Sequence, residues 1–236
     1  MKRITGRYGT EIISLAGGRS NVFLVLSGNN KILVDTGPAF MRKIIIRRLR
    51  KLSIRTIDYL VLTHTHFDHA ANARAIKDFF NARVIVHASE EEFLRSGDSP
   101  VPAGTNLFTG WLTGTFGKLA NRVVKYQGCD ADITFDQQLN LSEDLRNIQI
   151  IHTPGHSAGS VSVIIDNEIA LAGDTLFGTY PGSSFPPFAD DLKLLFKSWE
   201  LLLKTGCSVF LPSHGSVRTR EQVSRELSKR NHSNSA

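Results

Sequence analysis

Three histidines and one aspartate lie within six positions of this chain, directly after an apolar run. The run YLVL occupies residues 59–62, and the cluster consists of His64, His66, Asp68 and His69. An apolar run of this length, bounded by polar residues, is typical of a buried strand. Strand ends are rigid, and the loops beyond them are free to carry chemistry. The chain must therefore fold so that a buried strand delivers metal-binding side chains to one edge of a sheet.

The spacing within this cluster indicates how its members are used. In an extended backbone, residues two apart point to the same side, so His64 and His66 can bind one ion. Asp68 and His69 lie where the chain enters a helix, and adjacent residues point apart. They would therefore more easily serve a second ion. Asp68 would also lie near the helix N-terminal amides, which favour an ionised, ligating carboxylate.

Three further apolar runs are each followed by a side chain of metal-binding type. IQII precedes His156, IALAG precedes Asp174, and SVFLP precedes His214. If the strands end at one sheet edge, these groups converge with the cluster. Imidazole and carboxylate suit zinc, and also iron or manganese. Seven ligands exceed the four of a structural zinc site. They fit two Zn2+ ions that share Asp174 and hold a hydroxide between them.

Strand-type and helix-type runs alternate along the chain. Helical spacing of apolar residues occurs at 40–52, 70–80 and 191–204, and a polar terminal helix is expected near 220–229. Strands are expected at 21–26, 31–34, 57–62, 83–86, 148–151, 161–165, 168–172 and 208–211. Strands covered by helices on the outside imply a layered α/β fold. We find no linker or internal repeat, so residues 1–236 are expected to form a single domain.

The stretch 96–123 breaks this alternation. It opens with the loop SGDSPVPAG, and three glycines then interrupt the apolar run 107–119. Each glycine weakens a helix by about 1 kcal/mol relative to alanine. We expect an inserted, substrate-facing segment. Its apolar run, with Trp111 and Phe116, forms either a wall over the metals for a small-molecule substrate or a packing contact, such as that of a homodimer.

The net charge is +6, and seven Lys and Arg residues fall within 42–55. This run predicts either a nucleic-acid surface or the solvated face of an amphipathic helix. No stacking aromatic residues accompany the charges, as single-strand binding would require. We therefore interpret the run as a solvated face and expect no nucleic-acid partner.

Targeting signals and cysteine chemistry also limit the function. No apolar run approaches the roughly 20 residues of a membrane span, and the N-terminus lacks the apolar core of a secretory signal. Cys129 and Cys207 are far apart and show no C-x-x-C spacing. We expect a cytoplasmic protein with no membrane association and no disulfide framework.

Four motifs, taken in order, resemble those of the metallo-β-lactamase superfamily. They are THTHFDH at 63–69, TPGHS at 153–157, AGDTLF at 172–177 and PSHG at 212–215. VDTG at 34–37 looks like the early aspartate turn of that family. The resemblance implies a four-layered αββα sandwich with the metal site at one edge of the two sheets. It implies two ligand sets that share Asp174, namely His64, His66 and His156 for one metal and Asp68, His69 and His214 for the other.

The resemblance also implies roles beyond metal binding. Asp35 would support a ligating histidine from behind. The chain has an aspartate at position 174 and no cysteine at a matching ligand position. In both respects its pattern looks more like the glyoxalase II, lactonase and phosphodiesterase members of the superfamily than like true β-lactamases. We expect a dinuclear metallo-hydrolase of a small ester, thioester or lactone. Asp68 would orient the hydroxide and relay a proton to the leaving group, and Tyr180 is a candidate hydrogen-bond donor to the developing oxyanion.

Two other functions stay open at this point. Persulfide (sulfur) dioxygenases of the same superfamily use a mononuclear iron site with fewer ligands, and a phosphodiester or nucleic-acid hydrolase could use the same metals. Metal analysis separates the first alternative from a dinuclear hydrolase. A steep fall of polyanion binding with salt would support the second.

Overall fold

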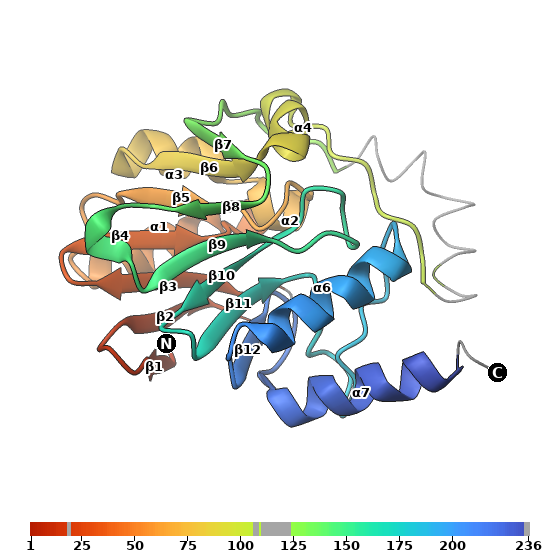
Figure 1. Ribbon diagram of the computed structural model, residues 1–236. Coiled ribbons are helices and arrows are strands. Elements are labelled where there is room, and N and C mark those ends of the chain that lie inside the picture. The colour runs from red at the N-terminus through yellow and green to blue at the C-terminus, as the bar shows by residue number, and fades with distance from the viewer. Residues whose placement is uncertain (18–19, 106–108, 110–123, 234–236) are drawn as a thin grey trace.

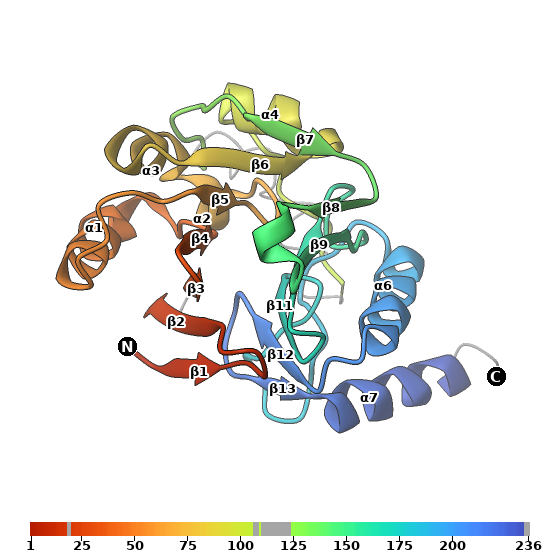
Figure 2. The ribbon, with the colours of Figure 1, turned by 60° about the vertical axis from the view of Figure 1, so that its left-hand side comes forward.

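The computed structural model describes residues 1–17, 20–105, 109 and 124–233. Two mixed β-sheets pack face to face, and helices cover the outer face of each sheet (Figures 1 and 2). This is the αββα arrangement that the family resemblance implies. Its four layers bring loops from both sheets to a common edge.

The first sheet has seven strands in the order β1-β2-β3-β4-β5-β6-β7. Strands β1 to β4 pair antiparallel, whereas β4 to β7 pair parallel. The bounds are β1 Arg3–Thr5, β2 Glu11–Ala16, β3 Val22–Ser27, β4 Asn30–Val34, β5 Tyr59–Val61, β6 Arg83–His87 and β7 Ile133–Phe135. The parallel half holds β5, whose C-terminal end carries the histidine cluster.

The second sheet has six strands in the order β13-β12-β11-β10-β9-β8. The bounds are β8 Gln138–Asn140, β9 Ile148–His152, β10 Val161–Ile165, β11 Ile169–Gly173, β12 Val209–Pro212 and β13 Arg218–Thr219. β10 is antiparallel to both β9 and β11, and β12 is parallel to β11. Strands β9, β11 and β12 therefore run in one direction and end at one edge.

The helices form the two outer layers. α1 (Arg42–Lys51), α3 (Ala73–Phe80) and α4 (Glu91–Ser96) cover the first sheet, and α6 (Leu192–Lys204) and α7 (Arg220–Ser233) cover the second. A short helix, α2 (Phe67–Ala70), lies at the edge that carries the site, and three 3-10 turns are η1 Ala39–Met41, η2 Ala88–Glu90 and η3 Glu143–Leu145.

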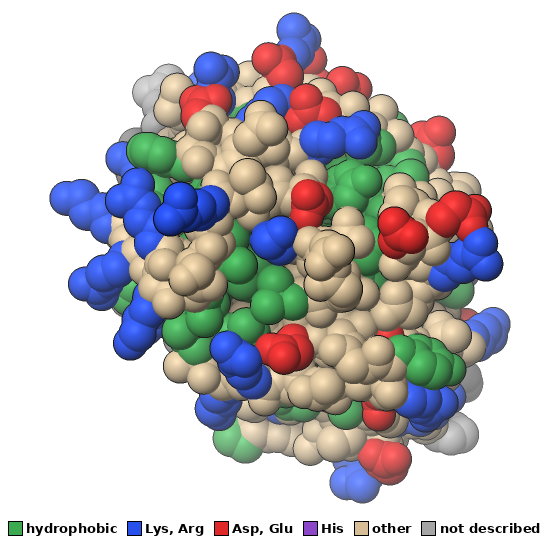
Figure 3. All heavy atoms as spheres, turned by 90° about the vertical axis from the view of Figure 1, so that its left-hand side faces the viewer, with side chains coloured by type: hydrophobic (Ala, Val, Ile, Leu, Met, Phe, Trp, Pro, Cys, Tyr) green, Lys and Arg blue, Asp and Glu red, His purple; other side chains and the backbone are tan. Residues whose placement is uncertain are grey.

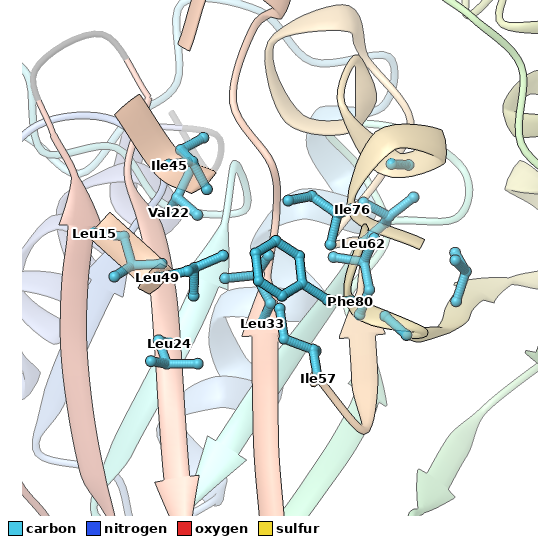
Figure 4. Close-up of a cluster of buried hydrophobic side chains, with 14 of the residues drawn as sticks. Leu15, Val22, Leu24, Leu33, Ile45, Leu49, Ile57, Leu62, Ile76 and Phe80 are labelled. Carbon is cyan, nitrogen blue, oxygen red and sulfur yellow. The ribbon is translucent and has the colours of Figure 1, made fainter. Parts of the chain in front are cut away.

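Apolar side chains at helical spacing fix α1 and α3 to the first sheet. Ile45 and Leu49 of α1 and Ile76 and Phe80 of α3 are buried together with Leu33 of β4 (Figure 4). A second cluster fills the space between the sheets, and a third packs α6 and α7 on the second sheet. Each fully buried Leu, Ile or Phe contributes about 1.5–3 kcal/mol. These layers provide a rigid frame for the loops.

The helix expected over 70–80 begins only at Ala73 in the structure, and a separate short helix precedes it. α2 ends at Ala70 and α3 begins at Ala73. Between them, the side-chain amide of Asn72 donates to the carbonyl oxygens of Thr36, Gly37 and Pro38 at 2.8, 3.0 and 3.0 Å. A continuous helix would not serve these three acceptors, so tertiary hydrogen bonding divides it. Strands β1, β2, β7, β8 and β13 lie outside the strands that the sequence predicts.

The stretch 96–123 is described only in part. Its first residues run beside the loop after β11, where the Thr105 amide donates to Pro187 O at 3.0 Å and the Ala189 amide to Ala103 O at 2.9 Å. Residues 106–108 and 110–123, which include Trp111 and Phe116, lie outside the described residues. The expectation of a wall or a homodimer contact therefore stays a prediction.

The cations of α1 and the segment after it lie on the outside of the molecule. Six of the seven are exposed and Arg48 is partly buried, and Lys and Arg side chains gather on this face (Figure 3). Ile45 and Leu49 face the sheet instead. This arrangement agrees with an amphipathic helix. No helix in the described ranges is long and apolar enough to cross a membrane.

Candidate metal centre

The seven candidate ligands come from four segments at one edge of the two sheets. His64 and His66 follow β5, Asp68 and His69 belong to α2, His156 follows β9, Asp174 follows β11, and His214 follows β12. The common direction of β9, β11 and β12 explains why ligands distant in sequence meet here. The structure brings all seven together.

Their ligand atoms form three groups in which all atoms lie within 4.8 Å of one another. The groups are His64, His66 and His156; His64, His69 and Asp174; and Asp68, His69 and His214. The first and third match the two ligand sets that the family resemblance implies. The second contains Asp174 and one histidine from each set.

Distances within the cluster fit shared coordination. His66 Nδ1 and His156 Nε2 lie 3.0 Å apart, close to the roughly 3.3 Å between two nitrogens on a tetrahedral zinc ion. Asp174 Oδ1 is 3.5 Å from His69 Nε2, and its Oδ2 is 3.5 Å from His156 Nε2 and 3.3 Å from His214 Nε2. The Asp174 carboxylate therefore lies between the two sets.

Buried atoms without hydrogen-bond partners point to a cation. His64 Nε2, His69 Nε2 and Asp174 Oδ1 are buried, and none has a hydrogen-bond partner in the described part of the chain. Leaving a buried polar atom unpaired costs about 1–3 kcal/mol. Three such atoms in one cluster are accounted for if they ligate metal, so the donor set fits a metal centre.

The ring nitrogens that face away from the cluster are held by the protein. His156 Nδ1 donates to Phe188 O at 2.9 Å, and His69 Nδ1 donates to Asp35 Oδ2 at 2.9 Å. Such contacts fix the ring orientation and tautomer, and they leave Nε2 available as a ligand. Asp35 also accepts from the Thr63 amide at 2.8 Å and from Ser213 Oγ at 2.9 Å. It thus lies behind the ring of His69, on the side away from the other candidate ligands.

Protonation differs between the two sets. Burial, with a smaller effect of nearby histidines, lowers the pKa of His64, and it lowers that of His66 to about 3. These rings are neutral, as metal ligation requires. For His214, burial opposes protonation, but Asp174 and Asp68 raise its pKa to about 10. Burial likewise opposes protonation of His69, but nearby carboxylates, mainly Asp174, raise its pKa well above the ordinary value. The carboxylate-rich set thus attracts positive charge.

A cavity of about 400 Å³ opens beside the ligands. Among the described residues, its wall combines His66, Asp68, His156, Asp174 and His214 with mainly apolar side chains: Phe67, Pro100, Val101, Pro102, Val124, Phe177, Pro187 and Phe188, together with Ser99. A small apolar pocket with a few convergent polar groups is typical of a site for a small organic molecule.

Tyr180 does not join this group. The residue is 62% exposed, and it is not among the described residues that line the cavity. The loop is instead fixed through the backbone, because Arg218 Nη2 donates to Tyr180 O at 2.7 Å. The structure therefore gives no support to an oxyanion role for Tyr180.

Sequence reasoning missed two features of the site. Gly173, directly before Asp174, has φ of +53°, and a Cβ there would lie 2.8 Å from Thr63 Cβ. Only glycine lets β11 approach the first sheet so closely. Glu90 is buried and accepts hydrogen bonds from Thr65 and Ser157, which are neighbours of candidate ligands. Its position in the run SEEE gave no signal, because such runs are usually solvated.

Known proteins resemble this chain in sequence and fold. A model of the metallo-beta-lactamase superfamily matches residues 15–214. A Methanocaldococcus jannaschii protein named "Probable metallo-hydrolase" is 29% identical over 210 residues, covering 86% of this chain and 91% of its own length. An uncharacterized Mycobacterium leprae protein is 30% identical over 82% of this chain and 84% of its own. The crystal structure of an archaeal superfamily protein from Sulfolobus tokodaii is 20% identical, has a TM-score of 0.65, and covers 92% of this chain and 85% of its own.

Proposed function

Because this chain belongs to the metallo-beta-lactamase superfamily, we propose that it is a dinuclear metallo-hydrolase acting on a small ester, thioester or lactone. The observation that carries the proposal is the position of Asp174. Its carboxylate oxygens lie 3.3–3.5 Å from histidines of both ligand sets. A single carboxylate shared by two sets is the arrangement expected of a two-metal site.

The proposed ligands divide between two ions. His64, His66 and His156 would hold one, Asp68, His69 and His214 the other, and Asp174 would contact both. When bound, two zinc ions would lower the pKa of water towards neutrality and polarise the carbonyl group of the substrate. Iron or manganese could occupy the same donors.

Asp68 is the proposed catalytic residue. Its side chain is 24% exposed, lines the cavity, and carries Oδ2 at 3.3 Å from His214 Nε2. Burial raises the pKa of Asp68, but His69 and His214 outweigh this and bring it down to about 2. The carboxylate is therefore ionised at neutral pH. It would orient the attacking water, accept its proton and return the proton to the leaving group.

The cavity supports a small substrate. Prolines, phenylalanines and valines make up most of its described wall. Such a surface binds the hydrocarbon part of an acyl group or lactone better than it binds a phosphodiester backbone, which needs cationic contacts. No lysine or arginine is among the described lining residues.

A substrate panel tests this proposal. Metal-free protein is loaded with zinc or manganese and assayed on thioesters, lactones, aryl esters, phosphodiesters and RNA. We expect turnover of one or more carbonyl substrates that depends on added metal and is lost in Asp68→Ala. Activity confined to phosphodiesters or nucleic acid would contradict the substrate class.

One observation favours a second candidate, a mononuclear-iron persulfide dioxygenase. The group His64, His69 and Asp174 contains two histidines and one carboxylate, which is the ligand set of many non-haem iron oxygenases. Metal analysis separates the two candidates. About one iron per chain with persulfide-dependent oxygen uptake would establish the dioxygenase, whereas about two metal ions per chain without oxygen uptake would favour the hydrolase.

A further inference from the structure

We infer that Glu90 is a positioning residue of the proposed metal site, holding the loop of His66 against the loop of His156. The inference rests on the proposed function only in that the cluster binds two metal ions. It does not depend on which substrate is hydrolysed.

Glu90 reaches two loops with its two carboxylate oxygens. It ends η2, and it is 2% exposed. Oε2 accepts from the Thr65 amide at 3.0 Å and also from the Thr65 hydroxyl. Oε1 accepts from Ser157 Oγ at 2.6 Å and from the Gly159 amide at 3.2 Å. One side chain therefore bridges the loop after β5 and the loop after β9, which belong to different sheets.

Both loops hold ligands of one set at the points that Glu90 contacts. Thr65 lies between His64 and His66, and Ser157 directly follows His156. The spacing of 3.0 Å between His66 Nδ1 and His156 Nε2 depends on how these two loops meet. Metal affinity is sensitive to such outer contacts, because they fix ligand positions before the ion binds.

Hydrogen-bond donors of these two loops stabilise the carboxylate of Glu90. No lysine, arginine or histidine in the described ranges forms an ion pair with it; its partners are the hydrogen-bond donors of Thr65, Ser157 and Gly159. A buried carboxylate is costly unless it is well hydrogen-bonded. Separating the loops would break some of these hydrogen bonds and leave the carboxylate with fewer donors. Glu90 therefore opposes their separation.

Other contacts further restrict the backbone and side chain of Thr65. Tyr126 Oη donates to Thr65 O at 2.7 Å, and Ser99 Oγ lies 3.2 Å from Thr65 Oγ1. A Cβ on Gly159 would lie 2.4 Å from Glu90 Cγ, so glycine is what allows the loop to approach the carboxylate. Every polar atom of Thr65 therefore has a partner, and the short segment between two ligands is rigid.

Asp35 has a position at the second ligand set that corresponds to that of Glu90 at the first. It contacts His69 and Ser213, so it connects the second-set ligands of α2 with the loop that carries His214. Each ligand set thus has one buried carboxylate that bridges the two sheets. Loss of Glu90 should weaken the ion held by His64, His66 and His156 more than the other ion.

The experiment measures metal binding without substrate. Metal-free wild type, Glu90→Gln and Glu91→Gln are titrated with Zn2+ against a chromophoric chelator, and with Co2+ to record its visible spectrum. In Glu90→Gln one oxygen becomes an amide nitrogen that cannot accept, so one loop is released. We expect one of two binding steps to weaken by about 10–100-fold, with an altered Co2+ spectrum. Exposed Glu91 is the matched control and should behave like wild type.

A second variant with a smaller structural change keeps the test valid if Glu90→Gln does not fold. Ser157→Ala removes one of the four hydrogen bonds to Glu90, together with the contact between Ser157 Oγ and Ser160 Oγ, and it keeps the Glu90 carboxylate. The same step should therefore weaken by a smaller factor. Thermal denaturation of each metal-free variant checks the fold. Wild-type affinity at both steps in Glu90→Gln, or an equal loss at both steps, would overturn the inference. Failure of wild type to hydrolyse any carbonyl substrate would contradict the proposed function but leave this result intact.

Discussion

Asp35 Oδ2 lies 2.9 Å from Nδ1 of His69, and the backbone of Asp35 has φ of +61°. A residue other than glycine rarely adopts this left-handed conformation, which costs free energy. Here it aims the carboxylate at the back of a proposed ligand. Asp35 also accepts from the amide and hydroxyl of Thr63 and from Ser213 Oγ. Its neighbours therefore hold the carboxylate in place, and the strain is compensated by these contacts.

Asp35→Asn should weaken metal binding at the second set by about 10–100-fold, because the amide is a poorer acceptor for the His69 ring N–H. The measurement is competition with a chelator of known affinity, at a pH where the wild type binds two equivalents. Asp78→Asn is the control, since Asp78 is exposed and pairs with Arg74 on α3. Equal affinity in Asp35→Asn and wild type would contradict a supporting role for Asp35.

Asp174→Asn should have the largest effect on metal content. The variant replaces the charged group that contacts both ligand sets, so at least one of the two ions should be lost on dialysis. The hydrolysis rate should fall by at least about 100-fold, because two-metal activation no longer operates. Elemental analysis of the dialysed protein and steady-state rates check this. Two retained ions with near-wild-type turnover would show that Asp174 does not bridge.

Stability of the metal-free protein should depend on pH through His66 and His214. The folded-state pKa of His66 is about 3, below its ordinary 6.5. Between pH 6.5 and 3 the unfolded chain therefore binds the proton more tightly, and the free energy of unfolding falls as pH falls. His214, with a folded-state pKa of about 10, acts oppositely. Between pH 10 and 6.5 the folded chain binds the proton more tightly, so stability rises as pH falls.

These two effects together predict a stability maximum near pH 6.5 for the metal-free protein. Urea denaturation from pH 4 to 10 measures it. The difference between wild type and His214→Gln isolates the alkaline side, and the difference between wild type and His66→Gln isolates the acid side. Wild-type stability that rises steadily from pH 6.5 to pH 4 would contradict the first effect.

Much of the candidate ligand set could be predicted from the sequence, because each segment that carries a candidate ligand follows an apolar run. Ile148–His152, Ile169–Gly173 and Val209–Pro212 are short buried strands, and buried strands are recognised by composition. Their shared direction depends on sheet order. Sequence alone does not give sheet order, and the family resemblance supplied the layered sandwich.

Features that depend on tertiary contacts could not be predicted. The break between α2 and α3 follows from the bonds of Asn72 to the loop 36–38, which no local pattern reveals. Glu90 lies among neighbouring glutamates that are exposed, and only its place beneath two loops buries it. Tyr180 is close to Asp174 in sequence, but its exposure of 62% depends on how the loop folds.

Phe67 should determine preference for apolar substrates. It lies between His66 and Asp68, lines the cavity and is 39% exposed. An exposed aromatic ring at a cavity mouth gains contact area when an apolar group binds. Phe67→Ala should therefore raise KM about tenfold for a substrate with a large apolar acyl group, while kcat and metal content change little. Because the ring is partly in solvent already, the fold should tolerate its removal.

A pair of substrates and a second variant make this test selective. The acetyl ester of the same alcohol should show a much smaller change in KM, since it does not reach the ring. Phe79→Ala is the control, because Phe79 is 58% exposed on α3 and is not among the described residues that line the cavity. An equal loss of kcat/KM for both esters would mean that Phe67 acts on the neighbouring candidate ligands His66 and Asp68 rather than on the acyl group. Lost metal in Phe67→Ala would lead to the same conclusion.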